Sequence, residues 1–195
     1  MEPSGPEDSF SQFREHIQNR LLDARRVVIN EALTTAVAGR ISQQITVLEA
    51  ESDEPVQVLM SNAPGGDVES GLSLYDLLRS MEAPVTILGS GRIAGAGVLC
   101  FVGVPSARRF ALPHVQFQFM EPRSEMDPEA TGDLAQEAER VRERRDRVVS
   151  LLTSATGQSV SQVESDVSAQ RTFEADDAVD YGLIQRVVQN RREIQ

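Results

Sequence analysis

The sequence contains no lysine, so all 19 of its basic residues are arginine. This absence excludes a Ser–Lys catalytic dyad, a Schiff-base lysine and a Walker-A phosphate loop, because each of these sites requires a lysine amine. The single cysteine, Cys100, cannot form a disulfide within the chain, and its apolar neighbours predict a small buried residue. Two histidines, His16 and His114, cannot by themselves form a structural zinc site, and we expect no metal and no cofactor.

Positive charge is also scarce, because 30 acidic residues give the chain a net charge of -11. A protein that binds nucleic acid would need a basic face. No apolar run approaches the length that spans a membrane. The acidic start, residues 1–9, lacks the apolar segment of a secretory signal. We therefore expect a soluble, cytoplasmic protein that binds neither nucleic acid nor membranes.

The pattern of apolar residues divides the chain into a tail and one domain. Residues 1–9 have the proline, glycine, serine and acidic content of a flexible tail, and residues 10–195 are expected to form a single domain. Apolar residues recur at helical spacing over 10–22, 35–49 and 129–155. The last of these predicted helices is long and highly charged, with a thin apolar stripe. We expect it to pack partly against another subunit.

Two units of strand, glycine-rich turn and helix follow one another at 56–80 and 85–103. This alternation predicts an α/β fold with parallel strands and right-handed crossovers. Further strands are expected at 27–29, 109–112, 115–119 and 183–188, and short helices are expected to end at Val167 and Tyr181.

The turn of the second unit is the place where chemistry is expected. Its tip reads A-G-A-G at 94–97, directly after an apolar strand. The helix that starts there presents free N–H groups, which can hold an anion or a developing oxyanion. A hydrolase would carry its nucleophile at this tip, as the G-x-S-x-G elbow carries a serine. No side chain at 94–97 can attack a carbonyl.

Five motifs occur in order along the chain. They read N-A-P-G-G-D-V at 62–68, V-T-I-L-G-S-G-R-I-A-G-A-G at 85–97, R-R-F-A-L-P at 108–113, T-G-Q-S at 156–159 and E-A-D-D-A-V-D-Y-G-L at 174–183. In order and spacing they resemble the motifs of the Clp protease proteolytic subunit family, ClpP, over about 21–188. The resemblance implies a crotonase-like α/β fold with a protruding handle helix. It also implies paired heptameric rings, fed by an ATP-driven unfoldase ring.

Members of this family cleave peptides with a Ser-His-Asp triad. Position by position, the resemblance places the serine at Gly95, the histidine at Met120 and the aspartate at Gln170. The segment around Gln170, S-A-Q-R-T-F, offers no carboxylate in its place. Peptide cleavage requires a nucleophile and a base, so we expect a subunit without peptidase activity.

Other family features are retained in the sequence. The resemblance places the oxyanion cradle at the backbone N–H groups of Gly66 and Ala96. Asn62 and Gly65 in the preceding turn either hold the backbone of a bound peptide or simply form the tight turn. His114, Ser90 and Cys100 are expected to be a turn histidine, a loop hydroxyl and a buried thiol rather than substitutes for the triad.

Three hypotheses for the function follow. The first is a pseudoprotease, a non-catalytic subunit in homo- or hetero-oligomeric rings with ClpP-like subunits, which scaffolds or regulates active paralogues in ATP-dependent protein degradation. The second is a triad-independent enzyme of crotonase type that uses the cradle on acyl thioesters, although no glutamate lies near Gly95 in the sequence. The third is an independent peptide-binding module.

Overall fold

The computed structural model describes residues 6–123 and 134–194, and its centre is a largely parallel sheet. Five strands lie in the order β1-β2-β3-β4-β7, and each neighbouring pair along this path is parallel. Strand β5 pairs in parallel with the end of β3, and β6 pairs antiparallel with β5. The strands are β1 (Arg26–Ile29), β2 (Val56–Ala63), β3 (Val85–Ala94), β4 (Arg109–Ala111), β5 (Gln116–Gln118), β6 (Thr172–Glu174) and β7 (Arg186–Val187).

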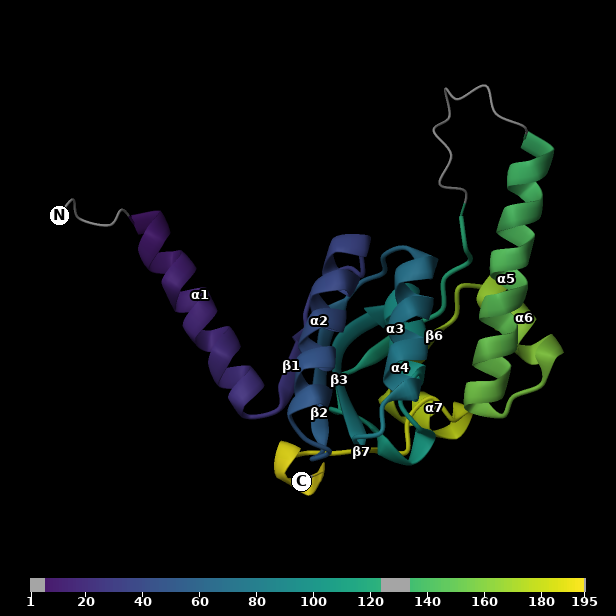
Figure 1. The fold of residues 1–195 in the computed structure, drawn as a ribbon. Coiled ribbons are helices and arrows are strands. Elements are labelled where there is room, and N and C mark those ends of the chain that lie inside the picture. Colours follow the sequence, from purple (N-terminus) through teal and green to yellow (C-terminus); the bar gives the residue numbers. More distant parts are fainter. Residues whose placement is uncertain (1–5, 124–133, 195) are drawn as a thin grey trace.

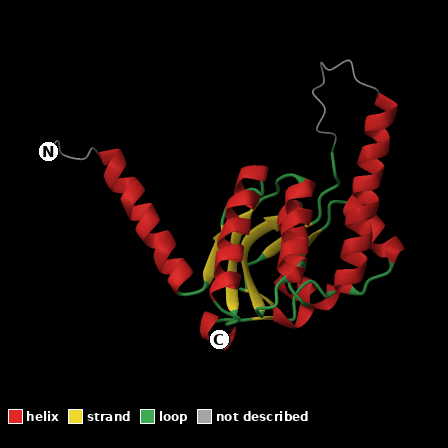
Figure 2. Cartoon of the chain, viewed as in Figure 1, coloured by secondary structure: helices red, strands yellow, loops and turns green. Residues whose placement is uncertain are grey.

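Helices surround this sheet (Figure 2). Helices α2 and α3 lie over one face, and α4 packs against α3. Helix α1 stands apart at one end of the molecule, whereas α5 extends beyond the body at the other (Figure 1). The helices are α1 (Pro6–Asp23), α2 (Thr35–Glu51), α3 (Val68–Ser80), α4 (Ala96–Val102), α5 (Leu134–Thr156), α6 (Val160–Ser168) and α7 (Ala175–Tyr181), with short 3-10 turns at Ser106–Arg108 and Arg191–Ile194. The predicted α/β class and its two strand–turn–helix units are confirmed.

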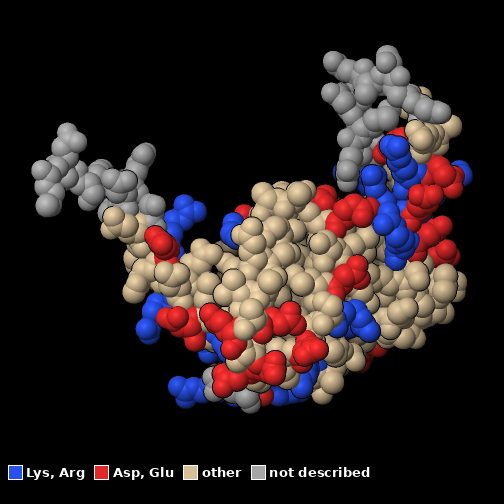
Figure 3. All heavy atoms as spheres, in the orientation of Figure 1, with Lys and Arg blue, Asp and Glu red and all other residues tan. Residues whose placement is uncertain are grey.

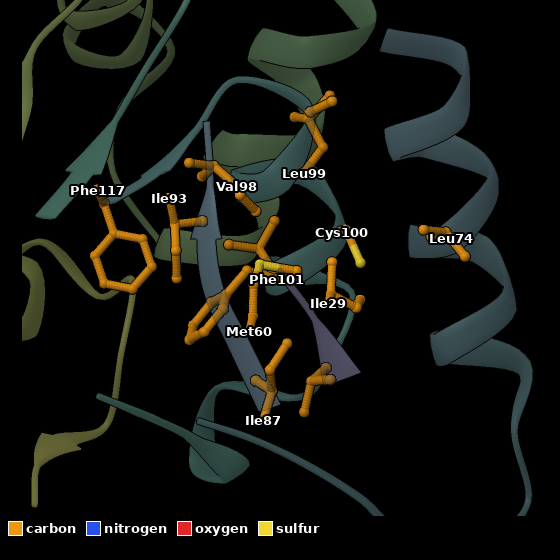
Figure 4. Packing of buried hydrophobic residues seen from close by; sticks show 14 of the residues in the cluster. Ile29, Met60, Leu74, Ile87, Ile93, Val98, Leu99, Cys100, Phe101 and Phe117 are labelled. Carbon is orange, nitrogen blue, oxygen red and sulfur yellow. The ribbon is translucent and has the colours of Figure 1, made fainter. Parts of the chain in front are cut away.

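The core lies between the sheet and these helices (Figure 4). Met60 and Ile87 project from adjacent strands toward α4, whose Phe101 stacks edge-to-face on Phe117 with ring centroids 4.9 Å apart. Cys100 of α4 is fully buried, and burial raises the pKa of its thiol to about 12. The predicted buried cysteine is confirmed.

A buried arginine connects the ends of two helices. Arg109 is 2% exposed and donates hydrogen bonds to the carbonyls of Val102 at 2.8 Å and Ala155 at 3.0 Å, and to that of Val104. Burial lowers the pKa of its guanidinium to about 10. The side chain therefore joins the carboxyl ends of α4 and α5, the two helices that flank the candidate site.

Several element boundaries differ from the sequence-based expectation. Helix α1 begins at Pro6 rather than at residue 10, so residues 6–9 belong to a helix and not to the expected tail, whereas residues 1–5 lie outside the described part. The first residues of the expected 129–155 helix, 129–133, also lie outside it. Strand β7 is shorter than expected because the backbone of Leu183 bonds the end of α7 instead of a strand. No described helix is long and apolar enough to cross a membrane.

Candidate functional site

The turn at Gly95 has the sharp strand-to-helix geometry of a nucleophile elbow. Gly95 connects β3 to α4 with φ 49° and ψ -117°, a backbone conformation that residues with a side chain rarely adopt. Its N–H donates to the carbonyl of Gln118 at 3.0 Å, and its carbonyl accepts from Val98 at 2.9 Å. Hydrogen bonds therefore fix the turn on both sides of Gly95. At its tip, Gly95 presents a hydrogen atom in place of a side chain.

Met120 lies beside this turn. Strand β5 pairs with the end of β3, with Ala94 opposite Gln118, and this pairing brings the residues that follow β5 next to Gly95. A Cβ atom added to Gly95 would lie 3.1 Å from Sδ of Met120. The structure thus brings together the two positions at which the resemblance expects a serine and a histidine, and a thioether occupies the space next to the turn.

Gln170 reaches the same end of β5 by way of β6, a strand that the sequence did not predict. Its carbonyl accepts a hydrogen bond from Nε2 of Gln118 at 3.4 Å, and the carbonyl of the next residue, Arg171, accepts from the N–H of Phe119 at 3.0 Å. Gln170 itself has a φ of 49° and ends the turn that follows α6. The three positions at which the resemblance places the triad are therefore at one end of the β3–β5–β6 arrangement.

A carboxylate that sequence reasoning missed lies behind Gln170. Asp166 of α6 is 6% exposed and accepts hydrogen bonds from Tyr181 at 2.8 Å, Gln162 at 2.9 Å and Arg171 at 3.2 Å. Burial raises its pKa, but these three donors outweigh burial, and the pKa of the carboxyl lies below its usual value. Burial and the neighbouring Asp166 raise the pKa of Tyr181. The carboxylate is held by structural partners, and the sequence gave no signal for it because Arg171 and Tyr181 lie outside the helix that carries Asp166.

The backbone cradle is formed where two turns meet. The N–H of Leu33 donates to the carbonyl of Gly65 at 2.9 Å, and the N–H of Asp67 donates to the carbonyl of Leu33 at 3.0 Å. The residues on both sides of Gly66 are therefore hydrogen-bonded to Leu33. Within residues 6–123 and 134–194, no backbone carbonyl accepts from that N–H. A side chain on Gly66, at φ 124°, would collide with the backbone of Leu33. Ala96, as the first residue of α4, has no acceptor within its helix.

Both cradle residues line one cavity of about 390 Å³ that also contains Gly95 and Met120. Its wall is mostly apolar and comes from α3, α4, α5 and the end of β5. The apolar side chains are Val68, Val98, Leu99, Phe119, Val148 and Leu152. A site of this size and lining fits an apolar side chain or an acyl chain next to two N–H donors.

Three polar side chains of the cavity are engaged with neighbouring residues. Thr34 accepts from the N–H of Val37 at 3.3 Å and caps α2, and Asp67 accepts from the N–H of Ser70 at 2.7 Å and caps α3. Glu121, next to Met120, pairs with Arg145 of α5 at 3.3 Å. Among the lining residues that the structure describes, none is a serine, cysteine or histidine. Of its polar side chains, Thr34 and Asp67 are engaged as helix caps and Glu121 as an ion-pair partner.

Asn62 does not line this cavity. It has a φ of 51°, and its Oδ1 accepts a hydrogen bond from the N–H of Arg92 at 3.2 Å, where the chain of β3 turns at Gly91. The carbonyl of Gly65 is likewise used by Leu33. These contacts give Asn62 and Gly65 a role in the turn, and binding of a peptide by either residue stays a prediction.

Comparison with known proteins bears on the whole domain. The Clp protease family profile matches residues 10–191. The ATP-dependent Clp protease proteolytic subunit of Paracoccus denitrificans is 33% identical and covers 87% of this chain and 84% of the relative. Subunit 2 from Pseudomonas aeruginosa is 30% identical over 96% of this chain and 92% of the relative. A point mutant of ClpP1 from Listeria monocytogenes superposes with a TM-score of 0.81 at 28% identity, covering 92% of this chain and 99% of that structure. The fold is that of ClpP, and the chain belongs to the Clp protease family.

Proposed function

We propose that this chain is a non-catalytic member of the Clp protease family. It assembles into Clp-type rings in the cytoplasm and scaffolds or regulates active paralogous subunits during ATP-dependent degradation. The observation that carries the proposal is the turn at Gly95, which has the elbow geometry, has no side chain and faces the thioether of Met120. Neither group can attack an amide or accept its proton.

The retained cradle does not compensate for these changes. In triad proteases the oxyanion donors and substrate binding alone leave about 10³–10⁴-fold acceleration over water, far below the activity of the complete site. The carboxylates Asp67 and Glu121, which line the cavity, are poor replacements for the base of the triad. Asp67 caps α3, and Glu121 is paired with Arg145. The chain is expected to bind extended peptides or acyl groups more readily than it cleaves them.

Assembly and catalysis depend on different parts of the molecule. The core and the helices are built from apolar faces across the whole chain, whereas cleavage depends on three side chains. Helix α5 extends beyond the body, and basic and acidic side chains lie side by side on its surface (Figure 3). Such a surface fits a polar contact with another subunit. Loss of the triad therefore leaves the assembly surfaces in place, and mixed rings contain fewer cutting sites.

The test is co-expression with the active Clp proteolytic subunits of the same organism. We expect native mass spectrometry to find this chain in mixed rings, and a fluorophosphonate probe to label only the active subunits. The matched control is an active paralogue whose serine is changed to alanine, which should give rings of the same low activity. Homogeneous rings of this chain that hydrolyse a fluorogenic peptide, with the activity abolished by one substitution in the cavity, would contradict the proposal.

The same preparation distinguishes the two alternatives. Turnover of an acyl thioester that is lost in Glu121→Gln would favour the crotonase-type enzyme, because Glu121 is a carboxylate that the fold brings to the cavity. Peptide binding by a chain that enters no ring in the presence of its paralogues would favour the independent binding module.

A further inference from the structure

The sheet ends, on the side of α1, at an open strand edge. In the described part of the chain, β1 pairs with β2 alone. The N–H of Gln57 in β2 donates to the carbonyl of Arg25 at 3.0 Å. Because the backbone groups of a strand alternate in direction, the N–H and carbonyl groups of Arg26 and Val28 then point away from β2. Such an edge is a template for one more strand.

A groove of about 420 Å³ runs along this edge between α1 and α2. Figure 1 shows β1 between these helices, with α1 approaching it only at its C-terminal end. Phe13, Ile17 and Leu21 form the α1 wall, and the side chains of Phe13 and Ile17 are 63% and 45% exposed. An amphipathic helix is stabilised mainly by covering its apolar stripe, so an occupant of the groove would stabilise α1.

The groove is basic although the protein is acidic. Arg14, Arg26 and Arg40 line it, with Glu31 as the single acidic residue among the described lining residues. Arg40 pairs with Glu31, and Arg26 donates to Gln57 at 3.2 Å. The groove thus carries more positive than negative charge, although the whole chain has a net charge of -11. This local positive charge favours an acidic occupant over a basic one.

We propose that this groove binds an extended segment of a partner protein, with alternating acidic and apolar residues, which adds to β1 as a new edge strand. The open backbone groups of Arg26 and Val28 would pair with the segment, its apolar side chains would cover the stripe of α1, and its carboxylates would meet the arginines. Strand β1 has four residues and spans about 13 Å, so a segment of four to six residues fills the edge. This site is separate from the cavity at Gly95 and does not depend on whether the chain is catalytic.

The experiment uses the full-length protein and a fluorescent, end-blocked hexapeptide of alternating valine and glutamate. We expect saturable binding by fluorescence anisotropy, and a roughly 3- to 10-fold weaker affinity in Arg14→Glu. Arg20→Glu is the matched control, because Arg20 is exposed on the same helix but does not line the groove. Both variants change an exposed side chain by the same charge, and circular dichroism should show the same folded state for both.

Two altered peptides separate the parts of the proposal. A peptide with lysine in place of glutamate should bind more weakly, and a peptide with alternate N-methylated amides should lose binding because it cannot pair with a strand. Equal binding of either altered peptide, equal effects of Arg14→Glu and Arg20→Glu, or no saturable binding would overturn the proposal. A change in oligomeric state in Arg14→Glu without peptide binding would also overturn it, since the occupant would then be a second copy of the chain.

Discussion

Replacement of Gly95 by alanine tests whether the site retains a strained elbow. At φ 49° and ψ -117°, a Cβ atom forces the backbone into a sparsely populated region, which costs about 1–3 kcal/mol. The added Cβ would also lie 3.1 Å from Sδ of Met120, but this contact is with the flexible end of a side chain and can relax. We therefore expect Gly95→Ala to lower the free energy of unfolding by about 1–3 kcal/mol, with backbone strain as the main cause.

The chain offers two control glycines that separate strain from glycine replacement in general. Gly39 lies inside α2 at an ordinary φ with no neighbour within 4 Å of an added Cβ, so Gly39→Ala should stabilise the protein by about 0.5–1 kcal/mol. Gly157 has a φ of 77° and the same open space, so Gly157→Ala isolates the cost of a positive φ without any contact, about 1–2 kcal/mol.

The assay is urea unfolding followed by circular dichroism, at a protein concentration where every variant has the same oligomeric state. Gly95→Ala with the stability of the parent protein would refute the reasoning, because the elbow would then be unstrained. A second measurement identifies the cause. If Met120→Ala restores the stability of Gly95→Ala, overpacking and not backbone strain is responsible.

Three further predictions concern buried groups elsewhere in the structure. The thiol of Cys100, with its pKa raised to about 12, should not react with a disulfide reagent near about pH 8 until the protein unfolds, and reaction of the native protein would contradict its burial. Asp166→Asn should destabilise the protein by about 1.5–3 kcal/mol at neutral pH, because the charged acceptor of Tyr181 is lost. The pKa of Asp166 is lower in the native protein than in the unfolded chain. The stabilisation that Asp166 provides is therefore present above the unfolded pKa of about 3.9 and is lost as the pH falls toward the native pKa. The urea unfolding curves of the parent protein and of Asp166→Asn should therefore converge in acid. Arg109→Met should lower the free energy of unfolding by more than about 3 kcal/mol, because the carbonyls of Val102, Val104 and Ala155 lose their donor. A smaller loss in urea unfolding would show that water replaces the guanidinium.

The sequence by itself determined the alternation of strands and helices and the absence of a nucleophile at the Gly95 turn. The spacing of apolar residues is a local property of the sequence, so it predicted helix α3, which begins at Val68, and strand β3, which begins at Val85. Glycines marked the turns of the two units. The missing side chain at position 95 is visible without any structure.

Only the tertiary structure decided which of these segments meet. Strand β6 has three residues, too few to show an alternating pattern, and it exists because Phe173 pairs with Phe117 of β5. That pairing brings Gln170 to the end of the strand that carries Met120. The contact of Met120 with Gly95 and the pairing of β1 with β2 alone both depend on residues far apart in the chain. Local sequence patterns do not encode such pairings, because they arise from the packing of whole elements.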